Sequence, residues 1–369
     1  MPDSTDVFVI GGGPAGLAAA IAARQQGFRV MVADGGKPPI DKPCGEALMP
    51  DAIAALERLG VAVPAAEAWP LVGVRFFTLE LSAEAVFPTG CYGISVRRTV
   101  LHRIMAERAA SLGVDLLWQS VVTGISGNEV RLGGRTIRAR WIVGADGVNS
   151  RVRRRAKLDA HSRTDRRFSF RQHYRVAPWT HHLEIYWGEH SQAYTTAVSD
   201  DQVCVAVASC DPNLRLEQAL TAFPELNARL CGVERVSAER GSVTANRKVR
   251  RVWRRNVALI GDASGTVDAI TGEGLGLSFQ QAVVLAQCLK SGNLTRYQAA
   301  HHRLARRPMM MAQLMLTLNG RPRLQRRTLQ VFRKRPEVFR RLLALHVGSR
   351  SPFHVALDGI TLAWELLIA

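Results

Sequence analysis

The chain of 369 residues has few cysteines and no long apolar run. Its six cysteines are scattered, and none forms a CxxC pair or another spacing typical of a metal site. We therefore predict no disulfide and no metal ion, in a compartment that keeps thiols reduced. No apolar stretch reaches the roughly 18 residues that a membrane span needs, and the first residues have no basic leader. These absences predict a cytoplasmic protein.

Acidic residues are scarce beside basic ones. The chain has 31 Asp and Glu against 49 Lys and Arg, and its formal net charge is +18. A charge of this sign suits nucleic acid, an anionic membrane surface or an anionic cofactor. No nucleic-acid recognition motif accompanies it, so we expect no nucleic-acid partner. The apolar fraction of 47% is that of a globular protein with a large core.

A dinucleotide-binding pattern opens the chain. A short apolar run is followed at once by Gly11-Gly12-Gly13-Pro14-Ala15-Gly16, and then by an alanine-rich helical stretch. Gly11 permits a tight turn, Gly13 lets the backbone approach a pyrophosphate, and Gly16 lets the helix lie close to the strand. Asp34 ends the next apolar run, where an acid can accept from ribose hydroxyls. NAD and FAD satisfy this pattern equally.

Two later segments repeat the strand-to-turn theme. They are Gly144-Ala145-Asp146-Gly147 and Gly261-Asp262, and the second leads to Thr271-Gly272-Glu273-Gly274-Leu275-Gly276 at the start of a helical stretch. The set resembles the p-hydroxybenzoate hydroxylase and geranylgeranyl reductase superfamily of flavoproteins, in which GxGxxG, a DG motif and a GD motif recur in this order. The resemblance, which includes the group A flavin monooxygenases, implies FAD. It assigns Asp262 to the ribityl chain, and Asp146 to both the FAD pyrophosphate region and the passing nicotinamide nucleotide.

Two further elements carry the same resemblance. Residues 42–47 resemble the KxCGEGL element that lies near the flavin, although Ala47 replaces the usual glycine. The resemblance implies that Cys44, Gly45 and Glu46 wall the ring. Arg98 begins a stretch similar to the RxxL(D)xxL element and becomes a candidate for the FAD phosphates or ribose, with Arg97 as its rival. A helix N-terminus at Gly272, Gly274, Leu275 and Gly276 would stabilise negative charge on the flavin pyrimidine.

The resemblance implies an α/β fold with a Rossmann-like FAD-binding domain of the glutathione-reductase type. An antiparallel-sheet substrate domain would interleave with it, and C-terminal helices would follow. We expect the FAD-binding domain at residues 1–70, 92–165 and 245–290, the sheet domain at 71–91 and 166–244, and the helical region at 291–369. The sheet carries the aromatic residues Phe168, Phe170, Tyr174, Tyr186, Trp187 and Tyr194. Most of these are expected to pack in the sheet, and one or two to line the substrate pocket.

No catalytic residue is fixed by the sequence; Cys44, Glu46 and His173 are pocket candidates. The leading hypothesis is an NAD(P)H-driven monooxygenase that acts on an aromatic or polyketide-like small molecule through a flavin C4a-hydroperoxide. NAD(P)H would dock only transiently, because no second Rossmann fingerprint is present. The alternative is an FAD-dependent reductase of prenyl or other lipid double bonds, and a halogenase or a non-catalytic flavoprotein ranks below both.

Arginine is dense in the C-terminal quarter, interleaved with Leu, Met and Phe. We interpret this region as helices with a solvated basic face, and a contact with anionic lipid at the membrane periphery is the alternative. The oligomeric state is left open.

Overall fold

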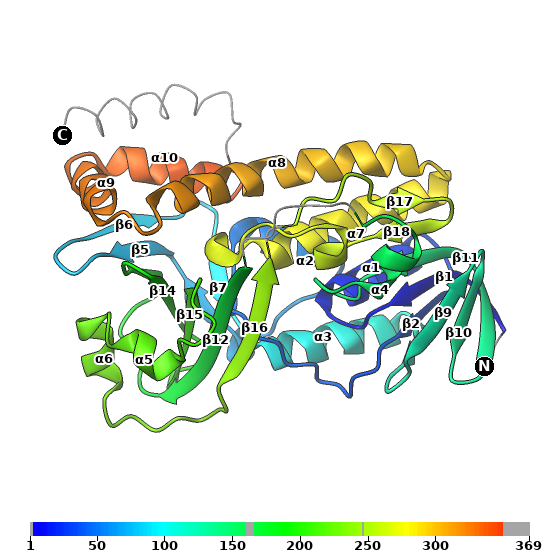
Figure 1. Ribbon diagram of the computed structural model, residues 1–369, viewed down its shortest axis with the longest axis horizontal. Helices are drawn as coiled ribbons and strands as arrows, with labels where there is room; N and C mark the ends of the chain where they lie inside the picture. Colours follow the sequence, from blue (N-terminus) through cyan, green and yellow to red (C-terminus); the bar gives the residue numbers. More distant parts are fainter. Residues whose placement is uncertain (1–2, 160–165, 246, 350–369) are drawn as a thin grey trace.

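The computed structural model describes residues 3–159, 166–245 and 247–349. Two large sheets lie at opposite ends of an elongated molecule, and a long helix runs across both (Figure 1). The expected α/β architecture, with a Rossmann-like half, an antiparallel-sheet half and C-terminal helices, is confirmed. Residues 350–369 of the predicted helical region lie outside the described residues.

The first sheet is built around β1 (Ser4–Ile10), the apolar run that precedes the glycine-rich turn. β1 pairs in parallel with β2 (Val30–Ala33) on one side and β11 (Arg135–Gly144) on the other. The sheet order is β17-β18-β11-β1-β2-β8, and a β9–β10 hairpin extends from β11. The remaining strands are β8 (Asp115–Leu117), β9 (Val122–Ser126), β10 (Glu129–Leu132), β17 (Trp253–Arg254) and β18 (Val257–Leu259).

Helices cover one face of this sheet. They are α1 (Pro14–Gln25), α2 (Pro50–Arg58), α3 (Arg98–Ser111) and α7 (Gly274–Ser291). α1 starts cleanly because Pro14 occupies its first turn, where no amide hydrogen is required. Its alanines let α7 pack closely, and Leu17 and Phe279 are fully buried between these layers. The opposite face is closed by the β9–β10 hairpin and the short α4 (Arg151–Arg155).

The second sheet has the order β16-β12-β15-β14-β13-β5-β6. Neighbouring strands are antiparallel except β13 and β5, which are parallel. The strands are β5 (Gly73–Phe77), β6 (Ser82–Val86), β12 (Arg166–Arg175), β13 (His182–Trp187), β14 (Ser191–Ala197), β15 (Gln202–Ser209) and β16 (Arg240–Ala245). Period-two alternation gives it two apolar faces. One face packs on α5 (Leu216–Leu220) and α6 (Pro224–Leu230), and the other faces the C-terminal helices.

Three C-terminal helices complete the described chain: α8 (Leu294–Leu318), α9 (Pro322–Lys334) and α10 (Pro336–His346). α8 packs on α7 at its start and reaches the second sheet at its end (Figure 1). A small sheet joins the halves, with strands β3 (Ala47–Leu48), β4 (Trp69–Leu71) and β7 (Gly93–Ser95). Short 3₁₀ turns are η1 (Ala65–Glu67), η2 (Gly261–Ser264) and η3 (Ala269–Thr271).

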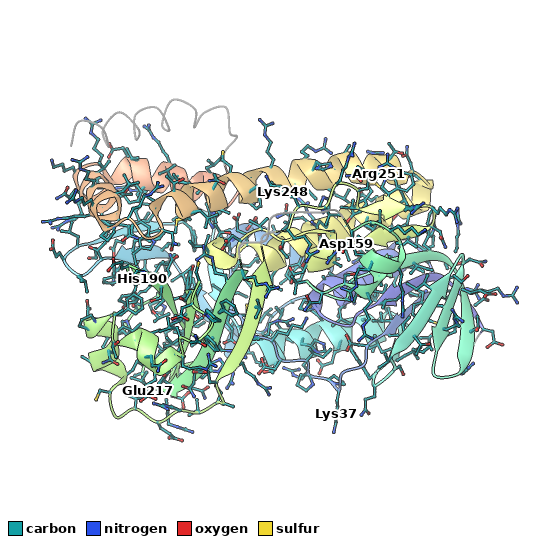
Figure 2. All side chains as sticks on the ribbon, viewed as in Figure 1. Lys37, Asp159, His190, Glu217, Lys248 and Arg251 are labelled. Atoms are coloured by element: carbon teal, nitrogen blue, oxygen red, sulfur yellow. The ribbon has the colours of Figure 1, made fainter. Side chains whose placement is uncertain are left out.

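Side chains cover the whole outline of the molecule in Figure 2. Lys37 and Arg251 lie on the half that holds the first sheet, and His190 and Glu217 lie on the other half. None of the helices in the described part of the chain is long and apolar enough to cross a membrane. The domain boundaries at residues 70, 91, 165, 244 and 290 stay a prediction.

Candidate functional site

The glycine-rich turn follows β1 directly. Gly11 has φ 107°, a conformation that residues with a Cβ rarely adopt. A Cβ on Gly16 would collide with the carbonyl oxygen of Gly11, so α1 can approach the turn only with glycine there. A Cβ on Gly13 would meet no protein atom within 4 Å, which leaves its backbone open to a ligand. The turn therefore has the shape that the sequence predicted.

Asp34 lies at the end of β2 beside this turn. One carboxylate oxygen accepts from the amide of Gly12 at 2.7 Å, and the other accepts from the amide of Gly36 at 2.7 Å. The side chain is half-buried and lines an open cleft together with Gly11 and Gly13. The two amides fix its orientation, and each carboxylate oxygen keeps a lone pair for a ribose hydroxyl.

The GD segment packs against the first turn. Gly261, with φ 58°, lies so close to Ala15 that a Cβ on it would be 2.7 Å from the Ala15 Cβ. The amide of Gly261 donates to Gln281 of α7 at 2.9 Å, which anchors the segment. The Asp262 side chain that follows is exposed to solvent. Desolvation by the surrounding protein raises the pKa of this carboxyl, against the opposing charges of Lys42 and Arg98.

Local hydrogen bonds hold the aspartate of the DG segment. The Asp146 carboxylate accepts from the Ser150 hydroxyl and from the amides of Arg151 and Val152 at 2.7 and 3.1 Å. These bonds cap the start of α4, so the carboxylate is committed to local structure. Asp146 still lines the cleft beside Gly11. Its capping bonds therefore leave the main chain of this segment as the part best placed to meet a cofactor.

The glycine-rich turn, Asp34 and the DG segment share one cleft, which we name the dinucleotide cleft. It has a volume of about 290 Å³, and its walls include the glycine-rich turn, Asp34 and the start of α4. Lys42, Arg151 and Arg155 add positive charge to the walls. Its chemistry suits a dinucleotide, because amides and cations meet phosphate at one side and a carboxylate meets ribose at the other.

Glycines in residues 44–46 and at the start of α7 also leave space that no protein atom fills. A Cβ on Gly45, Gly272 or Gly274 would meet no protein atom within 4 Å. Gly45 and Gly272 line a common cavity, and Gly274 begins α7. Gly276, by contrast, packs against α2, since a Cβ there would lie 3.0 Å from the Ala52 Cβ. Leu275 between them is half-buried at the start of α7.

Arg98 and Arg97 occupy different environments. Arg98 is 4% exposed, its amide donates to Glu46 Oε1 at 2.9 Å, and its Nη1 has no hydrogen-bond partner among the described residues. Arg97 instead bonds Gln202 at 3.1 Å and approaches His173 Nδ1 at 3.4 Å. A buried guanidinium nitrogen without a partner is expensive unless a ligand supplies the acceptor. Arg98 is thus the better candidate for an anionic group of FAD.

The residues 44–46 form the loop between the two halves of the molecule. Burial raises the pKa of the Cys44 thiol, and Arg98 opposes this only in part, so Cys44 is a thiol and not a nucleophilic thiolate. Glu46 has φ 61°, an unusual backbone for a residue other than glycine. The Thr196 hydroxyl donates to the Gly45 carbonyl at 2.7 Å and ties the loop to the second sheet.

Glu46 and His173 form a buried pair behind this loop. Glu46 Oε2 lies 2.7 Å from His173 Nε2, and both side chains are at most 1% exposed. Arg171 Nη1 lies 2.9 Å from His173 Nδ1, and an arginine can only donate. Nδ1 therefore accepts, and the imidazole is the neutral tautomer whose Nε2–H donates to Glu46. Burial alone would raise the pKa of Glu46, but the bond from His173 and nearby positive charge prevail and lower it.

Cys204 completes a cluster with this pair. One ligand atom each of Glu46, His173 and Cys204 lies within 4.8 Å of the others, as in a metal site. Burial raises the pKa of the Cys204 thiol well above its usual value, so this sulfur keeps its proton. Two guanidinium groups, of Arg98 and Arg171, lie close enough to act on the same groups. A protonated thiol and two neighbouring cations disfavour a metal ion here, and the cluster is better described as a hydrogen-bonded network.

A cavity of about 110 Å³ lies between this loop and the second sheet; we name it the inner cavity. Cys44 and Gly45 form one wall, Gly272 another, and Arg171 and Tyr194 belong to the sheet wall. Three of the residues predicted to surround the flavin ring, Cys44, Gly45 and Gly272, therefore meet at one place.

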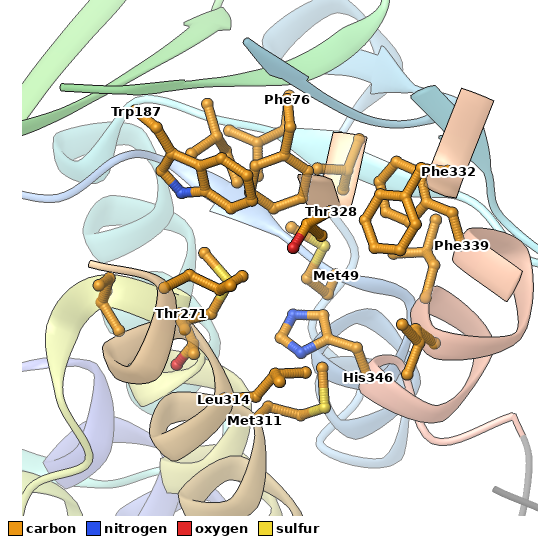
Figure 3. A pocket seen from close by; sticks show the side chains of 18 residues that line it. Met49, Phe76, Trp187, Thr271, Met311, Leu314, Thr328, Phe332, Phe339 and His346 are labelled. Carbon is orange, nitrogen blue, oxygen red and sulfur yellow. The ribbon is translucent and has the colours of Figure 1, made fainter. Parts of the chain in front are cut away.

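A second cavity, the apolar chamber, lies between the second sheet and α8–α10. Its volume is about 90 Å³, and fifteen of the eighteen described residues that line it are apolar. Figure 3 shows aromatic rings of Phe76, Trp187, Phe332 and Phe339 along one side. The sequence did not predict this chamber, because helical spacing of apolar residues in α8–α10 indicates a buried face but not an opening within it.

The sheet aromatics divide between two faces. Trp187 lines the apolar chamber, and Phe170 and Tyr194 line the inner cavity. Tyr174 and Tyr186 pack with α5 and α6 on the opposite face. Phe168 in β12 is half-buried.

The chain can now be compared with known proteins. Residues 4–306 match the family described as "FAD binding domain". The menaquinone reductase of Mycolicibacterium smegmatis is 27% identical over 333 residues, covering 81% of this chain and 80% of the relative. Digeranylgeranylglycerophospholipid reductase 1 of Methanopyrus kandleri is 26% identical, covering 73% and 76%.

Among solved structures, a flavoprotein/dehydrogenase from Cytophaga hutchinsonii superposes with a TM-score of 0.81 at 20% identity, covering 93% of each chain. This likeness shows the fold, and the family match spans most of the chain. The resemblance drawn from the motifs is confirmed, and the bound cofactor of this protein is FAD. The chain belongs to the FAD binding domain family and is an FAD-dependent oxidoreductase.

Proposed function

We propose that this protein reduces a carbon–carbon double bond in the isoprenoid chain of a lipid. The observation that carries this proposal is the apolar chamber beside the predicted flavin site. A hydrocarbon chain gains about 0.8 kcal/mol for each CH₂ group that leaves water for such a wall. Among the described residues that line it, only Thr271, Thr328 and His346 interrupt the apolar lining.

The chamber and the inner cavity share one partition. Ile270 and Thr271 of η3 line the chamber, and the next residue, Gly272, lines the inner cavity. The Tyr194 hydroxyl donates to the Ile270 carbonyl at 2.8 Å and fixes the partition from the sheet side. A lipid can therefore place its chain in the chamber while one end approaches the flavin site.

The protein contributes binding, orientation and exclusion of water. Reduced FAD supplies a hydride when bound, and NAD(P)H is the proposed reductant. We propose Gly11, Gly13, Pro14, Ala15 and Gly16 for the pyrophosphate region, with Asp34 at the adenosine ribose. Arg98 and Asp262 are proposed for the phosphate and ribityl portion, and the segment from Gly272 to Leu275 with Cys44, Gly45 and Glu46 for the ring.

The relatives support reduction over other chemistry. The two reductases described above align over about four fifths and three quarters of their own lengths. Their names concern a prenylated quinone and a prenylated glycerophospholipid, and both kinds of molecule carry long isoprenoid chains. An apolar chamber suits either chain.

Hydroxylation of an aromatic or polyketide-like ring is the second candidate. The inner cavity favours it, because Ser169, Arg171, Ser242 and Thr244 offer polar groups beside the predicted ring position. A hydroxylase would use molecular oxygen, and a reductase would not.

The decisive experiment offers menaquinone to the FAD-loaded protein with NADPH, with and without oxygen. We expect anaerobic formation of a product that is still heavier by dihydrogen after its head group has been re-oxidised to the quinone. Met315→Trp would fill the chamber, and we expect it to keep the flavin spectrum but lose turnover. Oxygen uptake with incorporation of an oxygen atom would favour hydroxylation, and turnover unaffected by Met315→Trp would remove the role of the chamber.

We also propose that the basic face of α8–α10 rests on anionic lipid. Residues 294–346 contain thirteen Lys and Arg and a single acid, Glu337. All thirteen except Arg307 are exposed, while the opposite faces of these helices line the chamber. Phosphatidylglycerol vesicles should bind the protein and phosphatidylcholine vesicles should not. Loss of one positive charge should weaken vesicle binding by roughly fivefold. Arg333→Glu and Lys334→Glu each also add a negative charge, so each should weaken binding by more than this. Equal binding to both vesicles would contradict this.

A further inference from the structure

Within the described part of the chain, one titratable side chain lines the apolar chamber: His346, at the end of α10. Figure 3 shows its imidazole extending into the space between Met49 and Leu314. The side chain is 13% exposed, and its Nδ1 has no hydrogen-bond partner among the described residues. A polar ring that faces an apolar cavity and has no hydrogen-bond partner destabilises the protein. The cost disappears when a ligand or a neighbouring group forms a hydrogen bond with the ring.

Glu273 lies directly behind this ring. Its Oε1 is 3.6 Å from His346 Nδ1, slightly longer than a hydrogen bond, and its side chain is 5% exposed. Neither carboxyl oxygen has a partner that meets hydrogen-bond geometry within the described structure. Glu273 precedes Gly274, the first residue of α7, and it follows Thr271 and Gly272, which line the chamber and the inner cavity respectively.

We infer that His346, oriented by Glu273, is the polar anchor of the apolar chamber and donates a hydrogen bond from Nε2–H to a carbonyl oxygen of the lipid. The ligand class is an apolar chain that carries a ketone, quinone or ester carbonyl. This inference rests on the proposed function, since it assumes that the chamber takes a hydrocarbon chain.

The protonation states determine which nitrogen donates. Burial raises the pKa of Glu273 to about 8, against opposing effects of Arg307 and Thr271, and Asp51 adds to the rise. Burial lowers the pKa of His346 to about 4. At neutral pH a protonated carboxyl therefore faces a neutral imidazole. The carboxyl can donate to Nδ1, which places the ring hydrogen on Nε2, the nitrogen available to the chamber.

Ionisation of Glu273 reverses this arrangement. A carboxylate only accepts, so it draws the ring hydrogen to Nδ1 and leaves Nε2 as an acceptor. A carbonyl in the chamber then meets a lone pair and loses its donor. The other charged groups at this point are Asp51 of α2 and Arg307 of α8, which form an ion pair with each other, and Gln280 of α7 bonds Asp51 at 3.1 Å. Their mutual pairing leaves the tautomer to Glu273.

The test compares two ligands of equal length, 2-undecanone and undecane, on the FAD-loaded protein. Each displaces the apolar fluorophore diphenylhexatriene, and the ratio of the two affinities isolates the carbonyl contact. At about pH 7 we expect the ketone to bind about 3- to 10-fold more tightly than the alkane, the range of one net hydrogen bond.

Two substitutions separate the roles of the pair. His346→Phe should remove the preference for the ketone while undecane still binds. In the wild type the preference should disappear at about pH 9.5, above the pKa of Glu273, and in Glu273→Gln it should persist because the amide donates to Nδ1 at both pH values.

The outcomes are distinct. If neither ligand displaces the fluorophore, the chamber does not take a chain and the proposed function fails with it. If both ligands bind the wild type equally, the chamber takes a chain but the anchor is refuted. A preference that survives above the pKa of Glu273 in the wild type would refute the orienting role of Glu273.

Discussion

Replacement of His173 by leucine tests the buried pair behind the loop of residues 44–46. In the folded protein His173 donates to Glu46 at 2.7 Å and accepts from Arg171 at 2.9 Å. The substitution leaves one oxygen of a buried carboxylate with no partner, while the amide of Arg98 still serves the other. Loss of one member of a buried pair destabilises a protein by about 3–5 kcal/mol. Arg98 and Arg171 stay close, so we expect the lower end of that range.

The loss should depend on pH. In the wild type the pKa of Glu46 is lowered, so its stabilising contribution is complete above the unfolded value and is lost as the pH falls through the folded one. Without His173, burial dominates and raises this pKa. A protonated Glu46 is then tolerated in acid, and the penalty should grow as the pH rises towards neutrality.

Urea unfolding at about pH 4.5 and about pH 7 measures this difference in the free energy of unfolding. Glu46→Gln in the His173→Leu background removes the unpaired charge and should recover at least about 1 kcal/mol at neutral pH. A loss below about 1 kcal/mol, or an equal loss at both pH values, would refute the pairing that we describe.

Three further predictions concern the cofactor turn and the buried acid. Gly13→Ala should fold normally but lose FAD, because its Cβ meets no protein atom and projects into open space; a retained flavin spectrum would contradict this. Gly16→Ala should lose native circular dichroism as well as FAD, since its Cβ collides with the Gly11 carbonyl; a soluble, folded variant would show that the turn can adjust. Glu273→Gln should gain stability relative to the wild type as the pH rises from 4.5 towards 8, by about 1.4 kcal/mol per pH unit. The raised folded pKa makes the wild-type acid destabilising in that window, and parallel unfolding curves across it would refute the shift.

The cofactor half of the site was predictable because its signals are local. Gly11, Gly13 and Gly16 occupy one turn. Their spacing alone predicts that Gly11 permits the turn after the strand, Gly13 faces the ligand and Gly16 packs the helix against the strand. Asp262 was assigned to the ribityl chain by resemblance alone, and that assignment stays a prediction. The capping role of Asp146 could not be predicted in this way. Its carboxylate accepts hydrogen bonds at the start of α4, and the DG motif does not indicate these bonds.

The substrate half depends on contacts between residues far apart in sequence. Glu46 and His173 are separated by 127 positions, and Glu273 and His346 by 73. A lone histidine in a strand or at a helix end carries no signal of its partner. The apolar chamber similarly combines residues of β5, β13 and three helices, whose period predicts burial but not the space that they leave.

The order of strands in the first sheet has a consequence for synthesis. β1 pairs with β11, and β11 pairs with β18 at Val257–Leu259, after which α7 closes the same face. The ribosome must therefore release nearly three quarters of the chain before the nucleotide-binding sheet can be completed. The intervening second sheet can pair within itself earlier, because β13, β14 and β15 are neighbours in both sequence and space. We expect cofactor capture to be a late event, and nascent chains stalled before β18 to bind no FAD.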